Sequence, residues 1–476
     1  MSERFDLRLS GGRVLLPGAD HLAEVDVLVR DGLIAGLCAP GAAADVAEEV
    51  SVTGLAVLPG IIDAHVHLGQ DITVPKTPDD ARKETEAAAA GGVCTLIAYL
   101  MMAVPYHEVL DDAVTVMETH GVIDFGFHFC VVTREQLAAL PSYARDLGVS
   151  SFKFFMNFRG DEGKYLGLPG NDDGFLLDLM HAAADAGGMV DPHGENIEIV
   201  WNRRAQPVPE GLSALGIWNH TRPDFVESEA QQRAAFLASV AGASMYAVHV
   251  TNAQTLDVLT RQRDRYPHIF LETCPHYLTH DVDSELGPVA KVNPPLRTAA
   301  DREALWQGIA RGDINVIGSD HVPRHRSAKV DDIWKASAGF PGLETLLPVL
   351  VSEGYHRRGL PLARLIAAVT STPARTFGLW PRKGAIAIGT DADFALVDLD
   401  GRFTVRAAEQ RTGAEYTIYE GWELTGAVEH TIVRGRFVVR DREVVASGGG
   451  GRFQARHHSG AAALAGRPVR PSEVPA

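Results

Sequence analysis

The chain has 476 residues, with 44 lysines and arginines against 61 aspartates and glutamates, a formal net charge of −17. This acidic balance argues against nucleic acid or an anionic membrane as the main partner, because both bind basic surfaces. With 46% hydrophobic and 22% charged residues, the composition is typical of a globular protein and excludes wholesale disorder.

The first and last structured parts of the chain are rich in short alternating strands. Residues 5–58 contain FDLRL, DVLVRDGLIAGL and SVTGLAVL, with an Asp31-Gly32 turn of the kind that joins hairpin strands. A second β-rich block covers residues 384–446. We expect residues 1–58 and 384–446 to form one small β-sandwich.

The middle of the chain, residues 59–383, alternates short apolar runs with helical patterns, which indicates parallel strands and crossover helices. Eight such repeats predict an α/β fold, a (β/α)8 TIM barrel, with an open doubly wound sheet as the alternative. The runs are IIDAHVH (61–67), VCTLIAYL (93–100), FGFHFCVV (125–132), SSFKFF (150–155), MVDPHG (189–194), MYAVHVT (245–251), IFLETC (269–274) and VIGSD (316–320).

Three further features bear on topology and compartment. The uncharged stretch 87–106 splits at Gly91-Gly92, so we interpret it as a helix end followed by a buried strand rather than a membrane span. Four scattered cysteines without a CxxC pair and a charged N-terminus without an apolar run predict a cytoplasmic protein. Residues 447–476 show no helical or strand period, and we expect a mobile or partner-contacting C-terminal tail.

Five of the eight apolar runs end in side chains that can ligate a metal ion. Because residues i and i+2 of a strand point to the same side, the two histidines of HVH face together, with Asp63 deeper in the barrel. Nitrogen and carboxylate ligands without thiolate suit Zn²⁺, with Mn²⁺, Fe²⁺ and Co²⁺ as competitors. The candidate ligands are His65, His67, Lys153, His193, His249 and Asp320.

Each of these residues also has a structural interpretation when taken alone. An HxH pair arises by chance, and Asp320 in GSDH is suited to cap a turn. Lys153 in SFKFF is harder to explain, because buried lysines are rare unless they are paired or functional. The occurrence of all six at strand ends, where barrel enzymes keep their catalytic groups, favours a metal-dependent active site.

The sequence resembles the amidohydrolase superfamily, and within it the cyclic-amide hydrolases: hydantoinases and dihydropyrimidinases, with allantoinases and dihydroorotases as relatives. The resemblance runs from about residue 4 to about residue 445. It rests on PGIIDAHVHL (59–68), SFKFFM (151–156), HGEN (193–196), ETCPHYL (272–278), KVNPPLR (291–297), GSDHVP (318–323), GFPGLETLLPVL (339–350) and PRKGAIAIGTDADFALVD (381–398).

The resemblance implies an enzyme that opens a cyclic amide by metal-bound hydroxide. A buried lysine has a lowered pKa, and its neutral amine can add CO₂ to give a carbamate that spans two cations. Two metal ions that share a water lower its pKa, and Asp320 is placed to pass the proton to the departing ring nitrogen. The implied arrangement has His65, His67 and Asp320 on one divalent ion, His193 and His249 on a second, and an N-carboxylated Lys153 between them.

Two positions depart from the relatives. Dihydroorotases carry an arginine directly after HxHL, where this chain has Gly69, and hydantoinases carry a tyrosine five residues after the bridging lysine, where it has Phe158. Residues 194–229 look more like hydantoinases and dihydropyrimidinases, whereas KVNPPLR and ETCPHYL lean toward allantoinases and dihydroorotases. A hydantoin, a dihydropyrimidine, allantoin or a related cyclic imide are all candidate substrates, and the enantiomer is open.

The resemblance also assigns residues around the ring. Phe158 and the segments at Asn293 and at Gly339 and Phe340 line the pocket, although Asn293 is equally suited to a turn before two prolines. His276 and His321 are interpreted either as outer partners of the ligands or as packed residues. Some dihydropyrimidinase-like proteins are non-catalytic scaffolds that have lost ligands, but here all six positions are filled. We expect a small cyclic amide as substrate and a homo-oligomer, a dimer or a tetramer.

Overall fold

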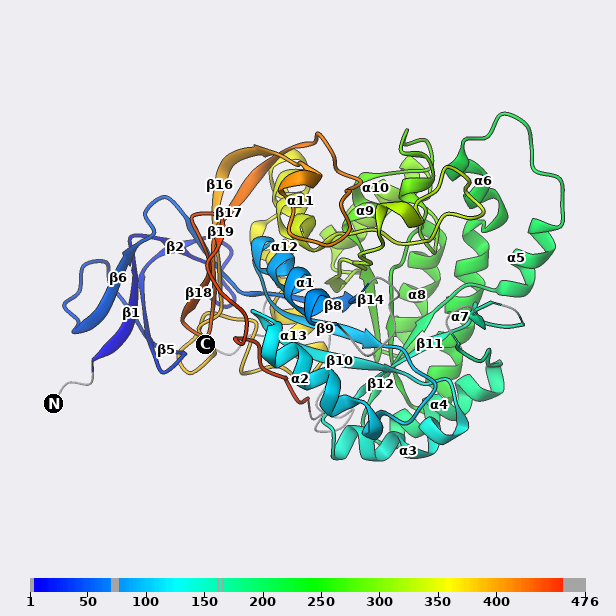
Figure 1. Ribbon diagram of the computed structural model, residues 1–476, viewed down its shortest axis with the longest axis horizontal. Helices are drawn as coiled ribbons and strands as arrows, with labels where there is room; N and C mark the ends of the chain where they lie inside the picture. The colour runs from blue at the N-terminus through cyan, green and yellow to red at the C-terminus, as the bar shows by residue number, and fades with distance from the viewer. Residues whose placement is uncertain (1–3, 70–76, 161, 165–166, 457–476) are drawn as a thin grey trace.

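A barrel of parallel strands forms the centre of the protein (Figure 1). The computed structural model describes residues 4–69, 77–160, 162–164 and 167–456. Within these residues, eight strands pair in chain order, and each predicted run overlaps one of them. They are β8 (Ile61–Val66), β9 (Val93–Leu100), β10 (Asp124–Cys130), β11 (Ser151–Phe155), β12 (Met189–His193), β13 (Ser244–Ala247), β14 (Ile269–Thr273) and β15 (Val316–Ile317).

The barrel closes between its first and last strands. Val66 forms a parallel bridge with His321, and the His67 N–H donates to the His321 carbonyl over 2.8 Å. This contact excludes the open doubly wound sheet. It also brings the carboxyl ends of β8 and β15, which carry two predicted ligand groups, next to each other.

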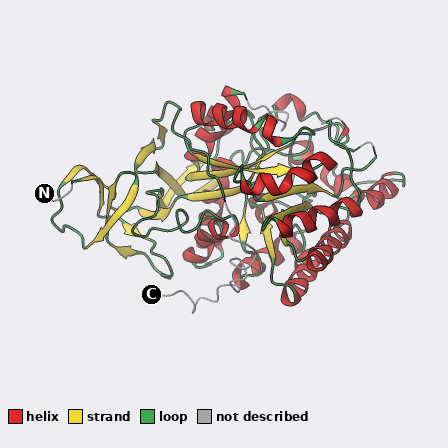
Figure 2. Ribbon diagram, turned by 90° about the horizontal axis from the view of Figure 1, so that it is seen from below, coloured by secondary structure: helices red, strands yellow, loops and turns green. Residues whose placement is uncertain are grey.

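Helices cover the outside of the barrel (Figure 2). Several begin at capping boxes, as Thr77 with Asp80, Thr133 with Gln136 and Thr298 with Asp301, where the two side chains satisfy free backbone N–H groups. The helices are α1 (Pro78–Ala90), α2 (Leu110–His120), α3 (Arg134–Arg145), α4 (Asp173–Asp185), α5 (Ile197–Arg204), α6 (Ala214–Thr221), α7 (Asp224–Ala241), α8 (Ala253–Arg265), α9 (Pro275–Thr279), α10 (Ala299–Arg311), α11 (Leu346–Val349), α12 (Leu362–Ala367) and α13 (Ser371–Thr376).

Both ends of the chain build the predicted β-sandwich beside the barrel (Figure 1). One sheet has the order β5-β4-β1-β6, and the other has the order β19-β18-β17-β16-β7-β2-β3. Asp31 and Gly32, with φ of 54° and 77°, form the predicted hairpin turn. The strands are β1 (Phe5–Ser10), β2 (Arg13–Val14), β3 (Ala23–Glu24), β4 (Asp26–Arg30), β5 (Leu33–Cys38), β6 (Val46–Ser51), β7 (Ala56–Pro59), β16 (Phe394–Thr404), β17 (Glu423–Val433), β18 (Arg436–Arg440) and β19 (Glu443–Val444).

The start of the predicted tail packs against the barrel, which corrects the expectation of a mobile or partner-contacting tail for these residues. Phe453 bridges Phe125 at the start of β10, and the Gln454 N–H donates to the Phe125 carbonyl over 2.7 Å. Arg456 is fully buried, and its guanidinium donates to the Phe127 carbonyl. The segment has no period because it makes one short bridge with a strand instead of an amphipathic element. Residues 457–476 lie outside the described residues.

The uncharged stretch 87–106 is a helix end followed by a strand, as predicted, since α1 ends at Ala90 and β9 begins at Val93. Among the residues that the structure describes, we find no helix with the length and apolar character that a membrane crossing requires. The exact domain bounds stay a prediction.

Candidate metal centre

Three of the predicted ligands lie together where the barrel closes. His65, His67 and Asp320 are buried, and one potential ligand atom from each lies within 4.8 Å of the others. Asp320 Oδ1 is 3.1 Å from His65 Nε2 and 3.5 Å from His67 Nε2. Asp320 has a φ of 48°, a left-handed conformation that is uncommon outside glycine and that clusters at functional sites.

The other three predicted ligands face this group from β11, β12 and the end of β13. His193 Nδ1 and His249 Nε2 are 2.9 Å apart, and the His249 ring lies 5.5 Å from the ring of His65. His249 also has a positive φ, of 41°. Lys153 is buried, with Nζ 4.6 Å from the centre of the Tyr99 ring. Since that ring lies 5.0 Å from the ring of His65, all six residues converge.

Burial and neighbouring charges shift the pKa values in this group in different directions. Burial lowers the pKa of Lys153, which favours the neutral amine, and together with His193 it holds the pKa of His249 well below its usual range. Burial alone would lower the pKa of His65, but the carboxylates of Glu272 and Asp320 outweigh it and raise that pKa to about 9. Lys153 and His249 therefore offer neutral nitrogen donors beside the carboxylate of Asp320, and nitrogen and carboxylate groups of this kind are ligands of a divalent metal ion.

Two carboxylates orient the histidines, and sequence analysis assigned neither of them a role. Glu272 places its oxygens 2.9 and 3.0 Å from His65 Nδ1, and Glu195 Oε2 lies 2.7 Å from His193 Nε2. Such partners fix the ring orientation of metal-ligating histidines. A carboxylate inside the apolar run IFLETC was the available signal for Glu272.

Asp63 and His321 support the loop that carries Asp320. The Ser319 N–H and the His65 N–H each donate to Asp63 Oδ1 over 3.1 Å. Burial raises the pKa of Asp63 to about 6. His321 Nε2 lies 3.0 Å from Glu84 Oε2, and the Gly342 N–H donates to its Nδ1 over 3.1 Å. Both ring nitrogens of His321 are thus engaged, which favours the interpretation as an outer partner.

The predicted pocket residues lie in two places around the ligands. Phe158 stacks on Phe155, with ring centres 4.3 Å apart, and packs with Met101 and Leu168 in an apolar cluster that includes Tyr99. This cluster forms an apolar wall after β9, β10 and β11.

The remaining predicted residues lie outside the strands, in α9 and in two loops. Asn293 Oδ1 accepts a hydrogen bond from Trp218 Nε1 over 3.1 Å. Gly339 has a φ of 94°, and a Cβ there would lie 2.6 Å from Val322, so only glycine fits. The buried ring of Phe340 meets the ring of His276 edge-on, with centres 4.9 Å apart. Burial lowers the pKa of His276 to about 3.

A second group of acidic residues already has a cation between its members. Lys383 Nζ lies 2.7, 2.8 and 2.7 Å from carboxylate oxygens of Asp124, Asp391 and Asp393. Arg434 also pairs with Asp124 and Arg382 with Asp391, so three cations compensate the three carboxylates, and we do not interpret the group as a metal site.

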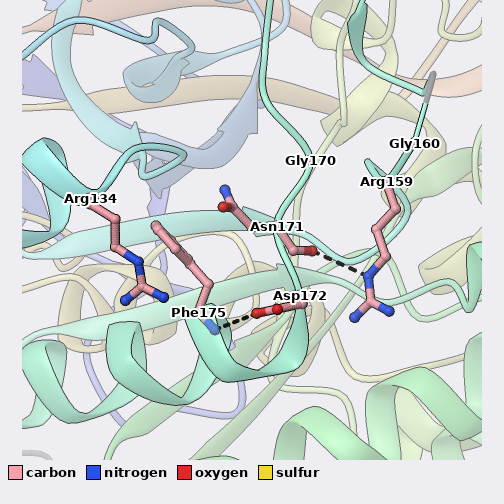
Figure 3. A pocket seen from close by; sticks show the side chains of 7 residues that line it. All are labelled: Arg134, Arg159, Gly160, Gly170, Asn171, Asp172 and Phe175. Carbon is pink, nitrogen blue, oxygen red and sulfur yellow. Dashed lines mark hydrogen bonds between the residues drawn. The ribbon is translucent and has the colours of Figure 1, made fainter.

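A cavity of about 300 Å³ lies outside the metal centre, between Arg134, Arg159 and the start of α4 (Figure 3). Arg159 pairs with Asp173 over 2.7 Å, and Arg134 pairs with Asp178. Because both guanidinium groups have carboxylate partners, this cavity offers no unsatisfied charge to a ligand.

The fold and the site together define a barrel protein with a divalent metal site. Known proteins are similar to this chain in sequence and in fold. Residues 217–438 match the amidohydrolase family. The chain is 34% identical to a D-hydantoinase of Streptomyces coelicolor, over 96% of this chain and 98% of that protein.

Solved structures agree with these matches. An L-hydantoinase (dihydropyrimidinase) from Arthrobacter aurescens superposes with a TM-score of 0.87 at 29% identity, over 95% of this chain and all of that one (100%). A dihydropyrimidinase from Brevibacillus agri gives a TM-score of 0.86 at 28% identity, over 95% of this chain and 98% of that chain. The chain therefore belongs to the amidohydrolase family, in the cyclic amidohydrolase group of the hydantoinases and dihydropyrimidinases.

Proposed function

We propose that the protein is a cyclic-amide hydrolase that opens the amide bond of a hydantoin or dihydropyrimidine ring. The observation that carries the proposal is the convergence of four histidines, a lysine and an aspartate at the carboxyl ends of the barrel strands. The similar proteins, which are named as hydantoinases and a dihydropyrimidinase, support the same reaction, because the similarity extends over nearly the whole length of each of them.

We assign two divalent metal ions, with zinc as the expected element, to the six residues. His65, His67 and Asp320 would hold the first ion, His193 and His249 would hold the second, and N-carboxylated Lys153 would supply a ligand oxygen to each. Buried ring nitrogens without a hydrogen-bond partner among the described residues, Nδ1 of His67 and Nδ1 of His249, support this fit. Metal ions held there would acidify a water and polarise the amide carbonyl.

The chain's own groups bind, orient and move a proton. Glu272 and Glu195 hold the His65 and His193 rings in place through hydrogen bonds. Asp320 accepts a proton from the attacking water and delivers it to the ring nitrogen as the C–N bond breaks, so that one carboxylate acts first as base and then as acid. The product stays in one piece, because the broken bond belongs to a ring.

We also propose a cytoplasmic homo-oligomer, a dimer or a tetramer. Four free cysteines support a reducing compartment. Phe236 and Val240, one turn apart on α7, leave 59% and 56% of their surface exposed, which supports a contact with a second copy.

Metal content and substrate range are the first measurement. We expect about two equivalents of metal per chain after purification without chelator, loss of activity on chelation, and recovery with Zn²⁺ or Mn²⁺ and bicarbonate. In a panel read by loss of amide ultraviolet absorbance, neutral hydantoins and dihydropyrimidines should react best, allantoin and other cyclic imides next, and dihydroorotate worst. Less than one equivalent of metal that no addition restores would contradict the metal assignment.

The low rank of dihydroorotate rests on the lack of a suitable cation. Gly69 stands where dihydroorotases have an arginine. Arg297, the other candidate, pairs with Glu227 over 3.1 Å and also donates to Asn219 and Thr251. A carboxylate on the ring would stay unpaired, which is costly in a buried site. Efficient turnover of dihydroorotate would overturn this ranking.

Phe158→Tyr tests what the apolar wall does. The new hydroxyl should raise kcat/KM for unsubstituted rings by up to about tenfold, which is the worth of one hydrogen bond, and should lower it for bulky aryl-substituted rings. Phe225→Tyr, at a half-exposed position on α7, is the matched control and should change neither. Equal effects on small and bulky rings would refute a role of this wall in specificity.

A further inference from the structure

An unusual group of cations surrounds one indole ring beside the metal centre. The Trp218 ring has Lys291 Nζ at 4.1 Å, the Arg222 guanidinium carbon at 4.8 Å and that of Arg204 at 5.3 Å from its centre. Trp218 itself is only 4% exposed. We call Lys291, Arg222 and Arg204 the Trp218 cation group. Each faces the aromatic ring, where a cation is attracted by the π electrons.

The carboxylates near this group do not neutralise all of it. Arg222 pairs with Glu195 and Arg204 with Glu162, each over 2.8 Å. Lys291 has no carboxylate within salt-bridge distance among the described residues, although it is only 5% exposed. Its Nζ makes one long hydrogen bond of 3.4 Å, to the Trp334 carbonyl. A buried ammonium without a counter-ion is costly, so the group has room for an anion.

A second buried lysine, Lys329, lies behind Lys291. Lys329 is 1% exposed, and its Nζ donates to the carbonyls of Ser337 and Lys291 over 2.7 and 3.3 Å. Burial and the charge of Lys291 hold the pKa of Lys329 well below its usual range. Burial, Arg222 and Arg204 likewise lower the pKa of Lys291 to about 8. Repulsion of this kind is relieved when an anion binds.

The Trp218 cation group is connected to the metal centre by hydrogen bonds. Glu195 accepts from Arg222 and also contacts the predicted ligand His193, over 2.8 and 2.7 Å. Trp218 donates to Asn293, and the Gly339 N–H donates to the Lys291 carbonyl over 2.9 Å. The cations therefore border the segments expected to hold the ring.

The mouth of the barrel is thus apolar on one side and positive on the other. The apolar wall around Phe158 follows β9, β10 and β11, whereas the cations follow β12 and β14. The contacts from His193 to Lys291 run through Glu195, Arg222 and Trp218, so we expect the group to meet a carboxylate on a side arm of the ring rather than one attached directly to it.

We propose that the Trp218 cation group is an anion subsite that selects cyclic amides with a carboxylate-terminated side chain. This proposal rests on the proposed function and specifies its substrate class. The anion would pair with Lys291 and with the faces of Arg222 and Arg204 that their own carboxylates leave open, since the Nε atoms of both arginines have no hydrogen-bond partner among the described residues.

The test compares two hydantoins of equal size, one with a propionate arm and one with the neutral propionamide arm. The unmodified protein should prefer the acid by at least about tenfold in kcat/KM, because a charge-assisted hydrogen bond is worth about ten- to a hundredfold. Lys291→Met, which keeps the length of the stem, should remove this preference and leave the amide within about twofold. Lys291→Arg should keep the preference. Lys335→Met, at an exposed lysine nearby, should behave like the unmodified protein.

Each outcome decides the proposal. Equal kcat/KM for the two arms in the unmodified protein, or a preference that survives in Lys291→Met, overturns it. Titration calorimetry with glutarate and with inorganic phosphate adds a direct measurement. If these free anions bind in a way that depends on Lys291, but the enzyme shows no preference between the two hydantoins, the proposed substrate class is also overturned. If neither hydantoin is opened, the proposed function fails. Calorimetry with the propionate-arm hydantoin then decides the subsite alone, and unchanged affinity in Lys291→Met rejects it.

Discussion

Asp320→Asn should leave a folded protein whose kcat is lower by at least about 10² to 10⁴, the usual worth of a general acid–base group. The asparagine keeps the shape of the side chain but cannot accept a proton from water and pass it on. It also weakens the contacts that Asp320 makes with the His65 and His67 rings, at 3.1 and 3.5 Å. The loss should therefore exceed that of a proton carrier alone.

Metal analysis and circular dichroism of the same variant separate the two effects. A variant that retains metal and fold but has lost turnover supports proton transfer by Asp320. Asp283→Asn, at an exposed carboxylate, is the matched control and should keep full activity. Near-normal turnover in Asp320→Asn would refute the assignment.

Lys153→Ala should lose both activity and metal, with kcat/KM reduced by more than about a hundredfold. Removing a residue that only orients a ligand costs about 10- to 100-fold, and a bridging ligand should cost more. Lys153 is buried, with a lowered pKa, so its neutral amine can add CO₂. Short carboxylic acids in the assay should partly restore activity, because they can occupy the space that the side chain leaves.

The carbamate has its own spectroscopic readout. Unmodified protein exchanged with ¹³C-bicarbonate should show a carbamate carbon resonance that Lys153→Ala lacks. Lys83→Ala, at a part-exposed lysine on α1, is the control and should keep resonance, metal and activity. Full metal and full activity in Lys153→Ala would show that the bridging role is wrong.

The sequence predicted the barrel well because its signal is local. Each buried parallel strand is a short apolar run, and a polar side chain inside such a run stands out, as Lys153 does in SFKFF. The alternation of side chains along a strand placed His65 and His67 on one side. Such patterns can be recognised from a few neighbouring residues.

Contacts between distant residues were beyond that reasoning. Glu272 contacts His65, which lies 207 positions away in the chain, and Trp218 of α6 contacts Lys291, which lies in a later loop. No local pattern marks such pairs, since they exist only after the barrel has closed. The same limit applies to Arg456, which no helical or strand period distinguishes but which the fold buries completely.

The position of β7 in its sheet has a consequence for synthesis on the ribosome. β7 lies between β2 and β16, and Leu58 pairs with Ala395, near the other end of the chain. All eight barrel strands are made between these two elements, so the barrel has its complete sheet while one edge of β7 still waits for a partner. An unpaired apolar edge can pair with another nascent chain. Slow synthesis between these two strands should therefore lower the yield of folded protein, whereas a chaperone that covers β7 should raise it.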